Sequence, residues 1–265
     1  MKSGFPTVNQ SKSSAVLHII GFDVNLITIT ITLQVENKLE LIQTICTFID
    51  TSSSCCHPLV QWQHLLGWVN WALNSFPLLR PVLQLSYNKI AGKSIAHVSI
   101  YLNKQVIADL SWFTDTIGLV SGVCLLNFII WSTSDANLTI YCNASMTALG
   151  FYILQMNLAI TSPISQEQGL HHIFFYKAFC IVLALAFATQ LNHPPACLLI
   201  FTDSLNTVNM FHLLKAAEDY NHLLLFTAHL LLLQKTTLHV FHITGMDKIT
   251  DAVMWPISYH NPPSP

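Results

Sequence analysis

The chain has 265 residues, of which 52% are apolar and 9% are charged. Such a composition excludes an intrinsically disordered chain, because it can bury ample apolar surface. Its 11 Lys and Arg residues stand against 13 Asp and Glu residues, which excludes a strongly basic nucleic-acid-binding protein, and a single arginine, Arg80, is present.

The first half of the chain predicts a few strands followed by helices. Alternating β-branched residues over 17–33 indicate strands around a turn at Asp23–Asn25. The apolar spacing over 38–49 and the Trp-rich segment 59–73 are typical of helices, and a further helix is expected over 95–112.

The second half alternates more regularly, after a polar stretch at 133–137 that we take as the domain boundary. Strands are expected over 138–143, 148–155, 171–176, 197–202 and 238–243, and helices over 177–190, 205–217 and 220–234, with a short final helix that includes Asp251. Three successive strands followed by β/α alternation predict the α/β class, with a mixed sheet and helices on its faces.

The high apolar content raises the question of a membrane span. The best candidate, 117–131, has about 15 residues and includes Asn127, whereas a spanning helix needs roughly 20 apolar residues. No Lys or Arg asymmetry flanks it. The chain also begins with a polar segment and has scattered cysteines without a CxxC motif, so we expect an intracellular protein of the cytoplasm or nucleus with no membrane partner.

Four strings of the second half resemble a known family. They are YCNASMTALGFY (141–152), FFYKAFCIVLALAFA (174–188), FTDSLNTVNMF (201–211) and HITGMDKITDAV (242–253). In this order and spacing they resemble the ribonuclease H (RNase H) domain of retrotransposon reverse transcriptases, especially those of fungal elements. In the first half, IIGFDV and LLGWVNWALNSFPLLRP resemble the primer grip, thumb and connection that precede that domain.

The resemblance implies a domain organisation for nearly the whole chain. Residues 136–257 would form an RNase H-like fold, a five-stranded mixed sheet with flanking helices, followed by a tail at 258–265. Residues 1–35 would be the end of the polymerase palm with its primer-grip strands, and 36–132 a mainly helical thumb or connection segment. No Tyr-x-Asp-Asp motif occurs, so we expect the polymerase site and the rest of the reverse transcriptase to be missing from this chain.

The resemblance also implies a nuclease site. Enzymes of this family cleave the RNA of RNA–DNA hybrids with two Mg²⁺ ions, which four carboxylates hold. Asp203 and Asp251 match two of the four catalytic positions, whereas Asn143 stands in place of Asp and Lys177 in place of Glu. The summed charge of the four side chains falls from −4 to −1. We therefore expect Asp203 and Asp251, the remaining metal ligands, to bind Mg²⁺ weakly or not at all.

Lys177 is the more damaging of the two replacements, because an ammonium group has no lone pair to offer a metal. At about 4 Å and an effective dielectric constant near 20, a misplaced unit charge costs roughly 4 kcal/mol per unit of metal charge. We expect Lys177 instead to form an ion pair with Asp203 or Asp251 in the place of the metal. A weakened one-metal site, or an alignment in which Glu167 supplies the missing acid, are the alternatives.

The implied function is that of a fragment of a retroelement reverse transcriptase and ribonuclease H polyprotein. Its nuclease site would be inactive, and weak binding of an RNA–DNA hybrid would remain. One alternative is a live Mg²⁺-dependent ribonuclease H that uses Asp203, Asp251 and the carbonyl of Asn143, and another is a small membrane protein. Asp→Asn and Glu→Lys each need a single G-to-A change, so we interpret the chain as a degenerate copy of a transposable element.

Overall fold

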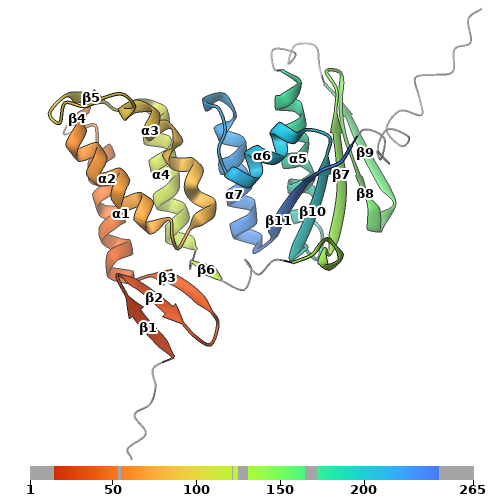
Figure 1. Ribbon diagram of the computed structural model, residues 1–265, viewed down its shortest axis with the longest axis horizontal. Coiled ribbons are helices and arrows are strands. Elements are labelled where there is room, and N and C mark those ends of the chain that lie inside the picture. The colour runs from red at the N-terminus through yellow and green to blue at the C-terminus, as the bar shows by residue number, and fades with distance from the viewer. Residues whose placement is uncertain (1–14, 53–54, 121, 125–130, 165–171, 245–265) are drawn as a thin grey trace, which may run out of the picture.

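The computed structural model describes residues 15–52, 55–120, 122–124, 131–164 and 172–244. Figure 1 shows two parts side by side: a mainly helical part with a small sheet at one end, and a larger sheet with helices against it. Among the described residues, no helix has both the length and the apolar content needed to cross a membrane.

The small sheet is antiparallel and has the strand order β1-β2-β3-β6. Its strands are β1 (Val16–Ile19), β2 (Phe22–Asn25), β3 (Thr30–Leu33) and β6 (Val123–Cys124). The turn expected at Asp23–Asn25 is wrong, because these residues lie in β2 and the turn comes earlier, at Ile20 and Gly21. Gly21 adopts a φ of +83° there, and a Cβ at this position would lie 2.8 Å from the ring of Trp71.

Four helices build the first part: α1 (Val35–Ile49), α2 (Leu59–Ala72), α3 (Gln84–Ile90) and α4 (Lys104–Leu119). Their apolar faces meet in one core, and its largest fully buried side chains include Trp62, Phe76 and Phe113. Trp62 is therefore a core residue of α2.

The helix expected over 95–112 is wrong at its start. Residues 99–101 form strand β5 (Ser99–Tyr101), which pairs with β4 (Cys56–Pro58), and α4 begins only at Lys104. The side chain of Asn103 caps that helix by accepting a hydrogen bond from the backbone N–H of Val106 at 2.9 Å.

The larger sheet has five strands in the order β11-β10-β7-β8-β9. β7, β8 and β9 form an antiparallel meander, and β10 lies parallel to both β7 and β11. This confirms the expected α/β class and the five-stranded mixed sheet of an RNase H-like fold. The strands are β7 (Leu138–Ala144), β8 (Ala148–Ile153), β9 (Leu158–Pro163), β10 (Cys197–Thr202) and β11 (Thr237–His242).

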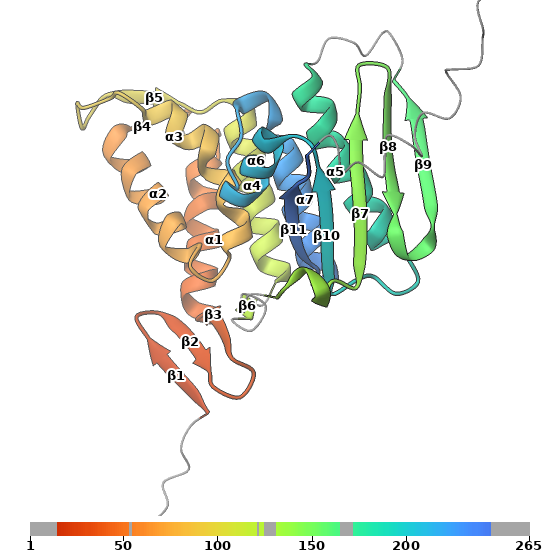
Figure 2. The same ribbon diagram turned by 45° about the vertical axis from the view of Figure 1, so that its right-hand side comes forward.

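Three helices accompany this sheet: α5 (Ile173–Thr189), α6 (Leu205–Leu213) and α7 (Asn221–Gln234). Figure 2 shows α5 and α7 running behind the strands, where they cover one face of the sheet. The apolar core between the helices and the sheet includes Ile140, Ile153, Leu185, Ile200 and Leu224.

The third strand expected over 171–176 is wrong: β9 lies at Leu158–Pro163, and Ile173 already begins α5. The sequence reasoning thus missed β9 and took the start of α5 for a strand, and each error has a physical cause. α5 is apolar on nearly all sides, so its sequence has no helical period that distinguishes it from a buried strand. β9 is an edge strand with mostly exposed side chains, so it lacks the apolar alternation of a half-buried strand. The correction moves Lys177 from the start of the helix into its second turn.

Helix α7 contributes side chains to the cores of both parts (Figure 1). Ala228 of α7 belongs to the core of the helical part, and Leu225 and Leu232 pack against that core, whereas Leu224 belongs to the core of the sheet. The side-chain amide of Asn221 also donates a hydrogen bond to the carbonyl of Pro81 at 3.0 Å. α7 therefore joins the two parts through both apolar and polar contacts.

Asp109 of α4 is a carboxyl group buried near this junction, with 3% of the residue exposed. Burial raises its pKa from 3.8 to about 6, against a smaller opposing effect of the hydrogen bond from Gln105. A raised pKa means that folding favours the protonated form. The stability that this group contributes is therefore complete below pH 3.8 and is lost as the pH rises through about 6.

We expect Asp109→Asn to stabilise the protein by about 1–2 kcal/mol at pH 8 and to have little effect at pH 4. The shift in pKa sets an upper limit of about 3 kcal/mol, which solvent screening and the polar amide reduce. Urea unfolding at the two pH values measures the difference. Asp115→Asn, at an exposed position of the same helix, is the matched control, and an equal gain in both variants would contradict the assignment.

Candidate functional site

The candidate site lies where the parallel strands β7 and β10 end. Thr202, the last residue of β10, pairs with Cys142 of β7. Asp203 follows Thr202 directly, and Asn143 follows Cys142 within β7. Both residues therefore lie at the same edge of the sheet. Strand register thus brings together two positions that the sequence resemblance singled out.

Helix α5 brings the third position, Lys177, to this edge. Cys180, one turn further along the helix, is buried, and its thiol lies 3.4 Å from the carbonyl oxygen of Asn143 and 3.2 Å from that of Gly150. The thiol has one hydrogen, so it donates to one carbonyl at a time. These contacts place Cys180 of α5 directly against the backbone of β7 and β8. Sequence reasoning missed the role of Cys180, because nothing local indicates which strand it faces.

Lys177 and Asp203 form an ion pair. The Nζ of Lys177 donates a hydrogen bond to Oδ1 of Asp203 at 2.6 Å, and the two side chains keep only 18% and 15% of their surface exposed. The structure therefore contains one of the two ion pairs that the sequence predicted. A short, charge-assisted bond between largely buried groups is among the stronger polar contacts in a protein.

Asn143 uses its side chain locally. Its Oδ1 accepts a hydrogen bond from the backbone N–H of the next residue, Ala144, at 2.8 Å. This oxygen is the only metal ligand that the Asn143 side chain could offer, and it is neutral. Asp251 and Glu167, the other acids considered from the sequence, lie outside the described residues.

The described side chains at this edge do not fit a pair of Mg²⁺ ions. Asn143, Lys177 and Asp203 together carry no net charge, whereas two divalent cations need several charged oxygen ligands. An ion at Asp203 would also have to displace the ammonium group of Lys177 from the carboxylate. The described part of the chain, which does not include Asp251, contains no group of three or more His, Cys, Asp or Glu residues arranged to hold a metal ion.

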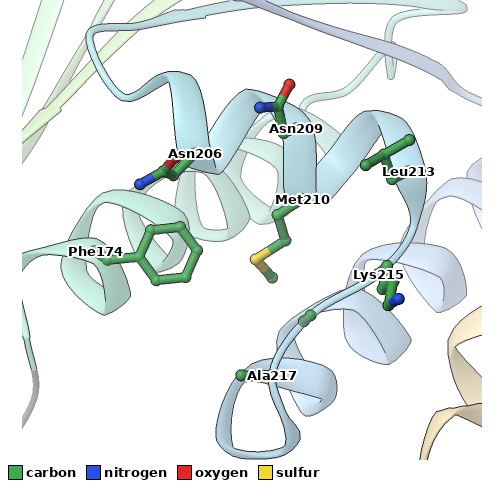
Figure 3. Close-up of a pocket in the computed structure, with 8 residues that line it drawn as sticks. Phe174, Asn206, Asn209, Met210, Leu213, Lys215 and Ala217 are labelled. Atoms are coloured by element: carbon green, nitrogen blue, oxygen red, sulfur yellow. The ribbon is translucent and has the colours of Figure 1, made fainter.

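A hollow of about 420 Å³ lies over α6, the helix that follows Asp203. Figure 3 shows Met210 pointing from α6 toward Phe174 of α5, with Asn206 and Asn209 along the same helix and Lys215 on the chain that follows it. Among the described residues, its lining offers the amide groups of Asn206 and Asn209 and the ammonium group of Lys215, and no carboxylate. These groups suit contacts with an anionic surface and not the binding of a metal ion.

No protein-family model and no curated protein matches the sequence. Among solved structures, the chain is similar to a foamy viral protease–reverse transcriptase in complex with dsDNA, at 14% identity and a TM-score of 0.33 over 88% of this chain and 46% of that one. It is also similar to LC11-RNase H1 in complex with an RNA/DNA hybrid, at 13% identity and a TM-score of 0.36 over 42% of this chain and 87% of that one. A third similar structure is RNase H1 of the halophilic archaeon Halobacterium salinarum, at 11% identity and a TM-score of 0.32 over 41% and 86% of the two chains.

The chain spans 38%, 29% and 46% of the length of three foamy viral protease–reverse transcriptase chains. At this level of identity and superposition, the fold assignment rests on the strand order and strand directions of the chain itself.

Proposed function

We propose that the chain is a fragment of a retroelement reverse transcriptase whose RNase H-like domain has lost nuclease activity. The ion pair between Lys177 and Asp203 carries this proposal, because it engages the one described carboxylate of the site at 2.6 Å. Hydrolysis of a phosphodiester by this type of fold needs metal ions that activate water and stabilise the leaving oxygen. A site whose described side chains sum to zero charge does not supply the ligands for them.

The proposal assigns a role to each part of the chain. Residues 1–35 are the end of the palm with its primer grip, 36–132 are the thumb or connection, 136–257 are the RNase H-like domain and 258–265 are the tail. Asn143 and Lys177 are the two replaced catalytic positions, and each replacement needs one G-to-A change from an acidic codon. This common change supports a degenerate copy of a transposable element.

We expect the chain to retain weak binding of an RNA–DNA hybrid. Lys215, Asn206 and Asn209 line the same hollow over α6 and offer donors to phosphate oxygens. Phosphate neutralisation drives such binding, and the chain has a net charge of −2. We therefore expect weak binding that a rise in salt concentration abolishes.

A cleavage assay with a labelled RNA–DNA hybrid tests the proposed function. We expect the natural chain to give the same product in Mg²⁺ as in EDTA, and the hybrid to bind only at low ionic strength. Asp203→Asn is the control for contaminating nuclease, because any cleavage that it retains does not come from this site. Chelator-sensitive cleavage that this variant lacks would contradict the loss of activity.

A further inference from the structure

The outer strand of the small sheet has an open edge. In the order β1-β2-β3-β6, strand β1 pairs with β2 on one side, and among the described strands none lies on its other side. Figures 1 and 2 both show β1 on the outside of the small sheet, remote from the larger sheet. An open strand edge presents main-chain N–H and C=O groups, so a further strand can be added there.

A row of apolar side chains crosses the small sheet and ends at this edge. Strand register sets Leu33 of β3 opposite Phe22 of β2, and Phe22 opposite Ile19 of β1, so the three side chains share one face. Leu33 is buried, and the half-buried ring of Phe22 lies 4.6 Å from that of Trp71. Ile19 is 47% exposed, and Leu17, on the same face of β1, is 44% exposed. A strand added beside β1 would cover both side chains.

The main-chain groups of β1 alternate between its two edges. In an antiparallel strand, each residue turns its N–H and C=O to the same side, and the next residue turns them to the other. The N–H of Leu26 donates to the carbonyl of Ala15 at 2.8 Å, so the odd-numbered residues of β1 face β2. His18 therefore turns its N–H and C=O toward the outer edge, where a strand can pair with them.

The residues of β1 do not oppose such pairing. Natural edge strands commonly carry a Lys or a Pro, which discourages pairing with another chain. β1 has the sequence Val-Leu-His-Ile and contains neither. Its one ionisable side chain, His18, contacts the carboxylate of Asp23 on β2 at 2.6 Å, which balances a positive charge on the imidazole. Two copies of this edge can therefore approach each other without repulsion between unpaired cations.

We propose that β1 pairs with β1 of a second copy of this chain, antiparallel about a two-fold axis perpendicular to the sheet. This axis leaves the apolar faces of both sheets on the same side, so each row continues into the other. In the register centred on His18, Leu17 lies opposite Ile19 of the second copy. The result is one sheet of eight strands, four from each copy. The proposal does not depend on the loss of nuclease activity.

The small size of this interface sets the expected affinity. Besides Leu17 and Ile19, the pairing covers Ile20, which is 84% exposed at the turn after β1 and would lie opposite Val16 of the second copy. Two four-residue strands with these side chains bury less than the roughly 1,200 Å² at which stable specific interfaces begin. We therefore expect a weak dimer, with a dissociation constant of about 10–100 µM.

The test is sedimentation equilibrium of the full chain, at protein concentrations from about one tenth to about ten times that dissociation constant. We expect the mass to rise from that of one chain toward that of two. Ile19→Lys should weaken association at least about tenfold, because it places an ammonium group in the apolar row. Ile95→Lys makes the same change at an exposed position before β5 and should associate like the natural chain.

A second control tests which sheet edge is used. β9 is the exposed outer strand of the larger sheet, and Ala159→Lys, which adds a charge there, should leave association unchanged. Circular dichroism checks the folding of each variant, and Leu17→Lys serves as the second edge variant if Ile19→Lys does not fold. The proposal is overturned if the natural chain stays monomeric throughout, if the folded edge variant associates like the natural chain, or if Ala159→Lys prevents association.

Discussion

The double variant Asn143→Asp, Lys177→Glu is expected to cleave an RNA–DNA hybrid in Mg²⁺ at least about a hundredfold faster than the natural chain. This is the size of effect that a single preorganised electrostatic group has on catalysis. The two changes replace a neutral and a cationic side chain by carboxylates at the edge where β7, β10 and α5 meet. The net charge of the three described side chains then falls from zero to −3, and Asp203 no longer pairs with an ammonium group.

A triple variant is the control for the expected gain in cleavage rate. Asp203→Asn added to Asn143→Asp, Lys177→Glu should abolish the new cleavage, because it removes the carboxylate at the end of β10. EDTA should abolish it as well. A double variant that stays silent although it is folded by circular dichroism would contradict the assignment of these positions to a nuclease site.

Lys177→Met is expected to destabilise the chain by about 2–4 kcal/mol at neutral pH. Methionine fills a similar volume, but it leaves the carboxylate of Asp203 without its counter-charge at a position where the side chain is 15% exposed. Removing one partner of a buried ion pair costs about 3–5 kcal/mol, and the remaining exposure reduces that figure. The midpoint of urea unfolding measures the loss.

A double-mutant cycle separates the ion pair from other effects of the methionine. Lys177→Met combined with Asp203→Asn removes both charges, so most of the lost stability should return. If the double variant were less stable than Lys177→Met by the full cost of a second lesion, the two side chains would not be coupled and the ion pair would not hold α5 to the sheet edge.

The elements that local sequence predicts well are those whose pattern is unambiguous. The sequence predicts β10 at 197–202, and the strand lies at Cys197–Thr202. The apolar run is too short for a helix and follows a Pro-containing turn, so its length and its flanking residues indicate a strand. α2 was expected over 59–73 and ends at Ala72, just before the turn that leads to Pro77. Over the described residues of the second half, the kinds of element follow the expected order, although the third strand lies at Leu158–Pro163 and not at 171–176. The expected final helix with Asp251 lies outside the described residues.

The errors in element assignment arise in segments whose side chains are buried on nearly all sides or exposed on both. α5 is apolar on nearly all sides, and the side chains of β9 are mostly exposed on both faces of the strand, so the spacing of apolar residues located neither element. The start of α4 depends on β5 pairing with β4, a contact between distant segments that no local pattern shows.

The candidate positions Asn143, Lys177 and Asp203 could be identified from the sequence because the pattern of the family that the chain resembles fixes their order and spacing, and their nuclease role stays a prediction. The residue types at 143 and 177 then indicate lost charge. The pairing of Lys177 with Asp203 depends on the packing of α5 against β7, where the thiol of Cys180 lies at the carbonyl of Asn143. The role of Asp251 stays a prediction, since it lies outside the described residues.

The most direct test of the proposal is a titration with Mn²⁺, a paramagnetic substitute for Mg²⁺, in which electron paramagnetic resonance measures the free ion. We expect the natural chain to show no saturable site that depends on Asp203, and Asn143→Asp, Lys177→Glu to gain at least one site that Asp203→Asn removes. Saturable Mn²⁺ binding by the natural chain that Asp203→Asn abolishes would show that Lys177 does not keep a metal ion from this carboxylate.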